Sequence, residues 1–139
     1  MSNPWDDFSK RVCNDNKNVA HVAVTSNLCG CETIWGKTDG FSLENTEVQC
    51  LQGEKKSKLF ENGVILGGIQ CRLLQDQLDT EGQYRMDLRT KGEPGNTAPV
   101  VIGKSCQALM IIVGTKEAQA GDLNNIMYNE ISNLRKSNM

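Results

Sequence analysis

The sequence predicts a layered α+β domain, with an antiparallel sheet in the middle of the chain and helices at both ends. Apolar residues recur at helical spacing near both termini, which indicates amphipathic helices. Between them lies a run of short β-rich segments separated by turn residues, and strands that follow one another in this way usually pair antiparallel. The 139 residues suffice for one hydrophobic core. Residues 1–139 are therefore expected to form a single domain.

The first helix is expected at the start of the chain. Asn3 can cap this helix, and Pro4 fits its first position. Asp6 and Asp7 suit the positive end of the helix dipole. Its apolar face consists of Trp5, Phe8 and Val12. The polar run 14–18 should end the helix.

Two short strands and a second helix are expected next. Residues 19–25 are rich in β-branched side chains, and residues 33–35 form a shorter run of the same kind. Ser42 is expected to cap a helix that runs to about Gln52, where Gly53 provides a stop.

The middle of the chain has the pattern of a β-meander. Residues 64–66 and 69–74 flank Gly67-Gly68, which is a signal for a two-residue hairpin. Apolar and polar side chains then alternate, as is typical of a half-buried strand. The alternating residues are Tyr84, Arg85, Met86, Asp87, Leu88 and Arg89.

Two further strands and a third helix complete the predicted fold. The strands are expected at 99–103 and 108–113, and the second should lie centrally in the sheet because it is apolar throughout. Asp122 can cap a final helix that runs to about Lys136. The buried stripe of this helix is expected to be Leu123, Ile126, Met127, Ile131 and Leu134.

Composition argues against several classes of function. The net charge of −2 provides no broad positive field for nucleic acid. The first seven residues lack the basic and apolar segments of a signal peptide, so the chain is expected in the cytoplasm with its six cysteines as reduced thiols. Cys29 and Cys31 form a C-x-C pair, but no second pair completes a zinc site. We therefore expect neither a metal nor a cofactor.

No catalytic constellation stands out in the sequence. His21 is the sole histidine, and its strand context favours a structural role. The chain contains neither a nucleophile elbow nor a glycine-rich phosphate loop. A cysteine nucleophile would need a histidine close in space. The chain is expected to be a binding protein and not an enzyme, with a thiol-dependent enzyme as an alternative that rapid labelling of one cysteine would reveal.

Two surfaces are candidates for binding instead. Trp5 and Phe8 lie one helical turn apart and can form a recognition platform, although the same spacing also fits core packing. Arg85, Arg89 and Lys91 can form a basic face on the sheet, or simply a solvated one.

Several segments resemble the profilin family. Residues 60–71, FENGVILGGIQC, resemble the central hairpin of profilins, and residues 86–91, MDLRTK, resemble their most recognisable strand. The Trp5 helix and the segment 134–137 resemble their terminal helices. The resemblance covers nearly the whole chain and is weakest in residues 27–41.

This resemblance implies a profilin fold, with a central antiparallel sheet and the N- and C-terminal helices packed together on one face. It also implies a cytoplasmic, cytoskeletal monomer that binds monomeric actin, proline-rich proteins, and phosphatidylinositol 4,5-bisphosphate at the membrane surface. Profilins regulate actin polymerisation and promote nucleotide exchange on actin without being enzymes.

The actin-binding surface implied by the resemblance is only partly present. The matching residues are Phe60, Leu73, Arg89, Lys91, Gly121, Asn124 and Tyr128. Two aromatic rings and two cations make a sensible set of anchors. Gln70 and Gln75 stand where similar profilins carry basic residues, Asn125 replaces a lysine, and Arg72 replaces a small residue. Because lost charge pairs slow association, actin binding is expected to be weaker than is typical of the family.

The implied proline-binding groove is also reduced. Its residues are Trp5, Phe8 and Trp35, which would stack on a polyproline II helix. Phe8 replaces a tyrosine and so lacks the hydroxyl donor, and Trp35 fits only if the loop before it is longer and the loop after it shorter than in profilins. Asn133 and Met139 stand in place of two further rings. Binding of proline-rich ligands is therefore expected to be weakened or altered.

Phosphoinositide binding is implied through Arg89, Lys91, Arg135 and Lys136. A basic side chain near anionic lipid contributes about 1 kcal/mol. Four such residues on a net negative chain imply modest, salt-sensitive binding. The loss of charge around the actin surface leaves one alternative open, a divergent profilin-fold adaptor or lipid-surface module with little actin affinity.

Overall fold

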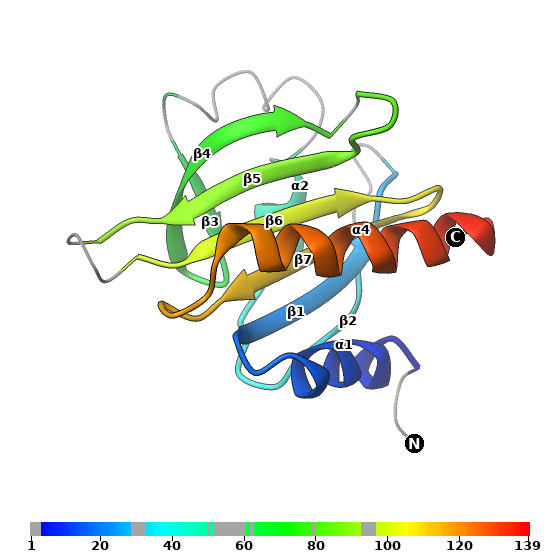
Figure 1. Cartoon of the computed structure of the whole chain (residues 1–139), viewed down its shortest axis with the longest axis horizontal. Helices are drawn as coiled ribbons and strands as arrows, with labels where there is room; N and C mark the ends of the chain where they lie inside the picture. Colours follow the sequence, from blue (N-terminus) through cyan, green and yellow to red (C-terminus); the bar gives the residue numbers. More distant parts are fainter. Residues whose placement is uncertain are drawn as a thin grey trace.

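The computed structural model describes residues 4–28, 33–49, 51, 61, 63–78, 80–92 and 97–139. Its elements are α1 (Pro4–Asp15), β1 (Val19–Ser26), β2 (Ile34–Lys37), α2 (Asn45–Gln49), β3 (Val64–Leu66), β4 (Ile69–Gln77), β5 (Arg85–Thr90), β6 (Pro99–Lys104), β7 (Ala108–Gly114) and α4 (Ala120–Lys136) (Figure 1).

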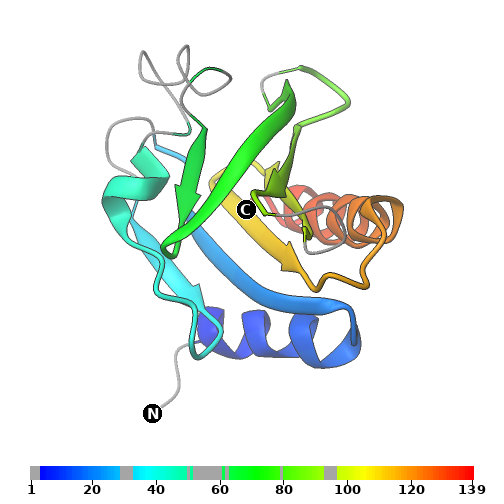
Figure 2. The same ribbon diagram turned by 90° about the vertical axis from the view of Figure 1, so that its left-hand side faces the viewer.

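Seven strands form one sheet in the order β2-β1-β7-β6-β5-β4-β3, and every neighbouring pair is antiparallel. Figure 2 shows that the sheet curls, so that it has a concave inner face and a convex outer face. α1 lies against β1 and β2, and α4 lies against β6 and β7. The predicted α+β architecture, with both terminal helices on one face, is confirmed.

Two hydrophobic cores lie on the two faces of the sheet. The inner core gathers Phe41, Leu43 and the α2 segment against inward-facing residues of β3 to β7. The outer core lies beneath α1 and α4, where Leu123, Met127 and Ile131 of α4 are buried as the helical stripe predicted. α1 and α4 run in opposite directions across this outer face (Figure 1). The start of α1 therefore lies on the same side of the molecule as the end of α4.

Close approach of α4 to the sheet depends on Gly103 in β6. A Cβ atom at this position would overlap the side chains of Met127 and Ile131. Since β6 faces the middle of α4, the missing side chain lets the helix pack directly on the strand.

The Gly67-Gly68 hairpin is confirmed. Leu66 pairs with Ile69, and both glycines have positive φ angles, 62° and 79°, which suit a two-residue hairpin turn. The carboxylate of Glu47 accepts the Gly67 N–H at 2.8 Å and the Gly68 N–H at 3.3 Å. The side chain of α2 therefore fixes the turn between β3 and β4.

Two predicted helix starts are wrong. The second helix begins at Asn45 and not after Ser42, because the buried side chains of Phe41 and Leu43 hold the preceding segment against the inner core. Its predicted end at Gln52 lies outside the described residues. Gln119 occupies the N-cap position of the final helix without a capping hydrogen bond from its side chain, and Asp122 lies in the first turn.

The predicted inward-facing position of Tyr84 is also wrong. β5 begins at Arg85, and Tyr84 precedes it with a φ of 49°. Met86 and Leu88 are buried in the inner core as predicted. β7 is buried along its whole length and lies between β1 and β6, which confirms its interior position.

Candidate functional site

An aromatic row forms where α1 crosses β2. It consists of Trp35, Trp5 and Phe8, and we refer to these three residues as the aromatic row. The ring centroids of Trp35 and Trp5 are 5.2 Å apart, and those of Trp5 and Phe8 are 5.7 Å apart in an edge-on arrangement. All three side chains are partly exposed. The structure therefore brings together the three residues predicted for a proline-binding groove.

The position of Trp35 depends on a close contact between α1 and β2. A Cβ atom at Gly36 would overlap the backbone of Trp5 and Asp6. The Asp6 carboxylate also accepts the Lys37 N–H at 2.9 Å. These contacts place Trp35 beside Trp5, an arrangement that depends on loop lengths and could not be read from the sequence.

Arg11 extends the aromatic row by one further planar group. Its guanidinium carbon lies 5.1 Å from the centroid of the Phe8 ring. Arg11 Nη2 donates to Glu130 of α4 at 3.2 Å, and Nη1 lies 3.7 Å from Asp15. Sequence reasoning missed Arg11, although its spacing of three residues from Phe8 indicates that the two side chains are neighbours on one helix face.

The C-terminal residue follows the end of α4 and lies against the turn between β6 and β7. The carbonyl oxygen of Met139 accepts hydrogen bonds from Gln107 N–H and, at 2.8 Å, from Ser105 Oγ. Met139 N–H donates to Leu134 O at 2.8 Å. Asn133 is exposed on the outer surface of α4. The last residue is therefore fixed by its backbone to the β6–β7 turn.

A second exposed surface lies where β4 and β5 meet α4, and we call it the β4–β5–α4 face. Its residues are Arg72, Leu74, Arg89, Asn124 and Tyr128. A small cavity of about 40 Å³ is lined by Leu74, Arg89 and Asn124, so these three residues from three elements are neighbours. Tyr128 is 69% exposed and Leu74 is 48% exposed, which is unusual for large side chains.

One of the residues predicted for actin binding, Leu73, does not join this face. Leu73 is only 4% exposed and belongs to the inner core. Leu74, the next residue, is exposed on the opposite face of β4, at the shift in register between Leu73 and Gln75. Phe60 lies outside the described residues. The resemblance implies Leu73, whereas alternation along β4 turns Leu73 inward and Leu74 outward.

The other predicted residues lie around the face. Gly121 is exposed at the start of α4. Arg89 Nε donates to Thr97 Oγ1 at 2.8 Å, which orients its guanidinium. Lys91 lies farther along the edge, where it lines a separate cavity with Ile65 and Gln70.

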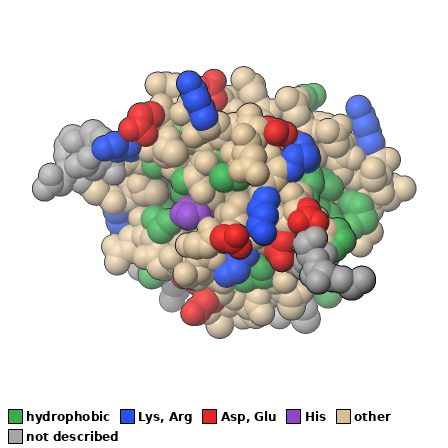
Figure 3. All heavy atoms as spheres, turned by 90° about the horizontal axis from the view of Figure 1, so that it is seen from below, with side chains coloured by type: hydrophobic (Ala, Val, Ile, Leu, Met, Phe, Trp, Pro, Cys, Tyr) green, Lys and Arg blue, Asp and Glu red, His purple; other side chains and the backbone are tan. Residues whose placement is uncertain are grey.

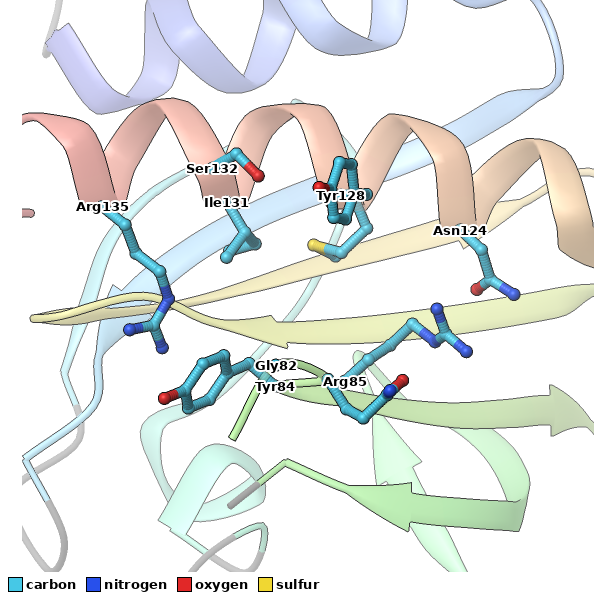
Figure 4. A pocket seen from close by; sticks show the side chains of 10 residues that line it. Gly82, Tyr84, Arg85, Asn124, Tyr128, Ile131, Ser132 and Arg135 are labelled. Atoms are coloured by element: carbon cyan, nitrogen blue, oxygen red, sulfur yellow. The ribbon is translucent and has the colours of Figure 1, made fainter. Parts of the chain in front are cut away.

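The basic residues predicted for phosphoinositide lie in two different places. Arg89 and Lys91 are at the end of β5, whereas Arg135 and Lys136 are at the end of α4. The Arg135 guanidinium stacks 3.6 Å from the Tyr84 ring centroid and donates to Lys104 O at 2.7 Å. Figure 4 shows Arg135 and Tyr84 next to each other at one end of a cavity of about 200 Å³ between α4 and the start of β5. Arg135 therefore has a packing role, while Lys136 is exposed.

The described residues offer little for catalysis. His21 stacks on Phe41 at 5.1 Å, and burial lowers its pKa. Burial also raises the pKa of the Cys71 thiol to about 11, which opposes a thiolate there. No group of three or more His, Cys, Asp or Glu side chains that could hold a metal occurs in the described part of the chain, and Cys29 and Cys31 lie outside it.

Charge on the α1 side of the molecule is mixed. Figure 3, which is seen from that side, shows basic and acidic side chains next to one another, with the single histidine reaching the surface among them. Within the described ranges, no helix is both long and apolar enough to span a bilayer.

Comparison with known proteins gives one consistent result. The sequence profile of the family described as Profilin matches residues 3–139. Profilin-2 of Bos taurus is 30% identical over 137 residues, which cover 96% of each chain. Profilin-1 of Homo sapiens is 33% identical over 109 residues, covering 76% of this chain and 78% of that protein.

Among solved structures, mouse profilin IIa in complex with a double repeat from the FH1 domain of mDia1 superimposes with a TM-score of 0.86 at 26% identity, over 98% of this chain and 99% of the other. The sequence match, the length of the aligned region and the arrangement of sheet and terminal helices all agree, and this chain belongs to the profilin family.

Proposed function

We propose that this chain binds monomeric actin, regulates its polymerisation and nucleotide exchange, and uses the β4–β5–α4 face to do so. The observation that carries the proposal is that Arg89 and the exposed Leu74 line one cavity with Asn124 of α4. The exposed ring of Tyr128 lies one helical turn beyond Asn124, with which it lines a second cavity. Aromatic and arginine side chains are the residues that most often dominate protein interfaces. Membership of the profilin family supports actin as the partner.

Binding should be weaker than that of relatives with a full set of charges. Gln70, Gln75 and Asn125, which stand where similar profilins carry basic residues, are exposed and carry no charge. Fewer complementary charges reduce the rate of association and the salt dependence of binding. Arg72 adds one cation to the same face, but it stands opposite Arg89 and so duplicates a charge that is already present.

The aromatic row supports a second binding activity, toward proline-rich segments. Aromatic rings side by side form the kind of surface on which a polyproline II helix stacks. The related mouse profilin IIa has been solved with a double repeat of an FH1 domain. Since Asn133 and Met139 supply no rings, the platform is limited to Trp35, Trp5 and Phe8, and affinity for proline should be reduced.

Phosphoinositide binding should depend mainly on residues other than Arg135. The contacts of Arg135 with Tyr84 and Lys104 O hold its guanidinium in place. Arg89, Lys91 and Lys136 are the remaining cations, and the first two lie beside the proposed actin surface. Binding to phosphatidylinositol 4,5-bisphosphate vesicles should therefore be modest and should compete with actin. Cosedimentation with such vesicles at low and high salt tests this, and binding that does not respond to the lipid contradicts it.

The test of the main proposal is nucleotide exchange on monomeric actin, measured together with affinity and beside human Profilin-1. We expect saturable one-to-one binding, faster exchange, and a dissociation constant higher than that of Profilin-1. The alternative of an adaptor or lipid-surface module with little actin affinity is favoured by the uncharged residues Gln70, Gln75 and Asn125. Lack of exchange activity at high micromolar protein would support that alternative. We also propose that the protein is a cytoplasmic monomer, which cell imaging and sedimentation would check.

A further inference from the structure

Arg11 lies next to Phe8 at one end of the aromatic row, and its N–H groups can donate hydrogen bonds to the backbone of a polyproline II helix. Such a helix has no internal hydrogen bonds, so its carbonyl oxygens are available as acceptors. Trp35, Trp5 and Phe8 supply stacking surface, and the phenyl ring of Phe8 has no donor of its own. The two tryptophans carry indole N–H groups, but at the Phe8 end of the row a hydrogen-bond donor has to come from a neighbouring residue.

Arg11 stands in the right place to be that donor. Its guanidinium lies 5.1 Å from the Phe8 ring, a separation close to the 5.2 Å and 5.7 Å between the rings themselves. A polyproline II helix rises about 3 Å per residue, so a ligand of about six residues is long enough to cover the three rings and reach the guanidinium.

Arg11 also retains donors for a ligand. A guanidinium has five N–H groups. Nη2 bonds Glu130 at 3.2 Å, whereas the 3.7 Å from Nη1 to Asp15 is an ion pair too long for a good hydrogen bond. The Arg11 side chain is 51% exposed, and that of Glu130 is only 16% exposed. Glu130 therefore holds one edge of the guanidinium from α4, and the rest of the group faces solvent.

We propose that Arg11 is a specificity-determining residue of the proline-binding groove, which donates hydrogen bonds to ligand carbonyl oxygens next to Phe8 and is oriented by Glu130. This inference rests on the proposed proline-binding function. It assigns to Arg11 the donor that a tyrosine hydroxyl at position 8 would otherwise provide. It also explains why α1 and α4 are joined by an ion pair beside the rings.

The experiment is a titration with decaproline, followed by tryptophan fluorescence, on the full chain. Arg11→Ala should weaken binding about three- to tenfold, the value of one hydrogen bond. Lys10→Ala is the matched control, because it removes a neighbouring cation that pairs with Asp39 away from the row, and it should leave the affinity unchanged. Thermal unfolding of each variant verifies that it is folded.

A second variant distinguishes a role of Arg11 as hydrogen-bond donor to the ligand from a purely structural role. Adding Phe8→Tyr to Arg11→Ala restores a hydroxyl at the same place and should recover most of the lost affinity, while Phe8→Tyr alone should change it little. Unchanged affinity in Arg11→Ala, or a loss that Phe8→Tyr does not rescue, would overturn the role of Arg11 and leave the proposed function intact. Failure of the unmodified chain to bind decaproline would instead contradict the proline-binding function itself.

Discussion

Arg72 and Arg89 stand directly opposite each other on β4 and β5. Like charges in this arrangement destabilise a sheet, since their side chains point to the same face at short range. They nevertheless add positive charge to the β4–β5–α4 face of a chain whose net charge is −2. We interpret the pair as part of a binding surface. Repulsion between the two arginines lowers the free energy of unfolding.

Replacing one of these arginines should therefore stabilise the fold. Arg72→Gln keeps a long polar side chain and removes the repulsion, so the free energy of unfolding should rise by about 0.5 kcal/mol at low salt. The gain should shrink at high salt because exposed charges are screened. Urea unfolding at two salt concentrations measures both effects. A loss of stability, or a gain that ignores salt, would speak against repulsion between Arg72 and Arg89.

Tyr128 should be an anchor for actin and not for folding. Its side chain is 69% exposed, so Tyr128→Ala should change thermal stability little. Loss of an anchor typically costs about 2 kcal/mol or more of binding energy, which corresponds to a roughly 30-fold weaker affinity for actin. Fluorescence titration of labelled actin measures this loss, with Lys10→Ala as a control on the opposite terminal helix. Equal affinities for Tyr128→Ala and the unmodified chain would remove Tyr128 from the interface.

Arg135 and Lys136 are neighbouring basic residues in different surroundings. Arg135 packs against Tyr84, whereas Lys136 is exposed to solvent. Arg135→Ala removes the stacking on Tyr84 and the hydrogen bond to Lys104 O, and should destabilise the fold by about 1–3 kcal/mol. Lys136→Ala alters an exposed side chain and should change stability by less than about 0.5 kcal/mol. Chemical denaturation of both variants provides the comparison. Equal stability of the two variants would contradict the packing role of Arg135.

His21 should make stability depend on pH. Burial disfavours its charged form and lowers its pKa in the folded chain, so the unfolded chain takes up the proton at higher pH. The stability linked to this residue is therefore present above the unfolded pKa and is lost as the pH falls toward the folded one. His21→Phe keeps a ring against Phe41 and should reduce the loss between about pH 7 and about pH 5. Denaturation midpoints across this range test the effect, and parallel pH profiles would exclude it.

The fold could be predicted largely because local patterns and tertiary packing agree. The alternation around Met86 and Leu88 and the stripe on α4 reflect which side chains face a core. Helix starts were less predictable, since Ser42 and Asp122 are good capping residues that the structure does not use as caps. For Ser42, burial of Phe41 and Leu43 outweighs the local capping preference.

The candidate site was predictable in its residue types but not in its arrangement. Trp5, Phe8 and Trp35 were identified, yet their contact depends on the close approach of α1 to Gly36. Leu74 was missed because the resemblance implies its neighbour Leu73, which alternation along β4 turns toward the inner core. Contacts between distant parts of the chain, such as Arg11 with Glu130, have no local sequence signal.

Calorimetric titration of monomeric actin with the unmodified chain and with Arg89→Glu tests the central claim most directly. The introduced carboxylate would face Arg72, so the variant should remain folded. We predict saturable one-to-one binding of the unmodified chain and at least a tenfold loss in the variant, as expected for reversal of an interfacial charge. Absence of binding by the unmodified chain, or equal binding by both proteins, would contradict the assignment of the β4–β5–α4 face to actin.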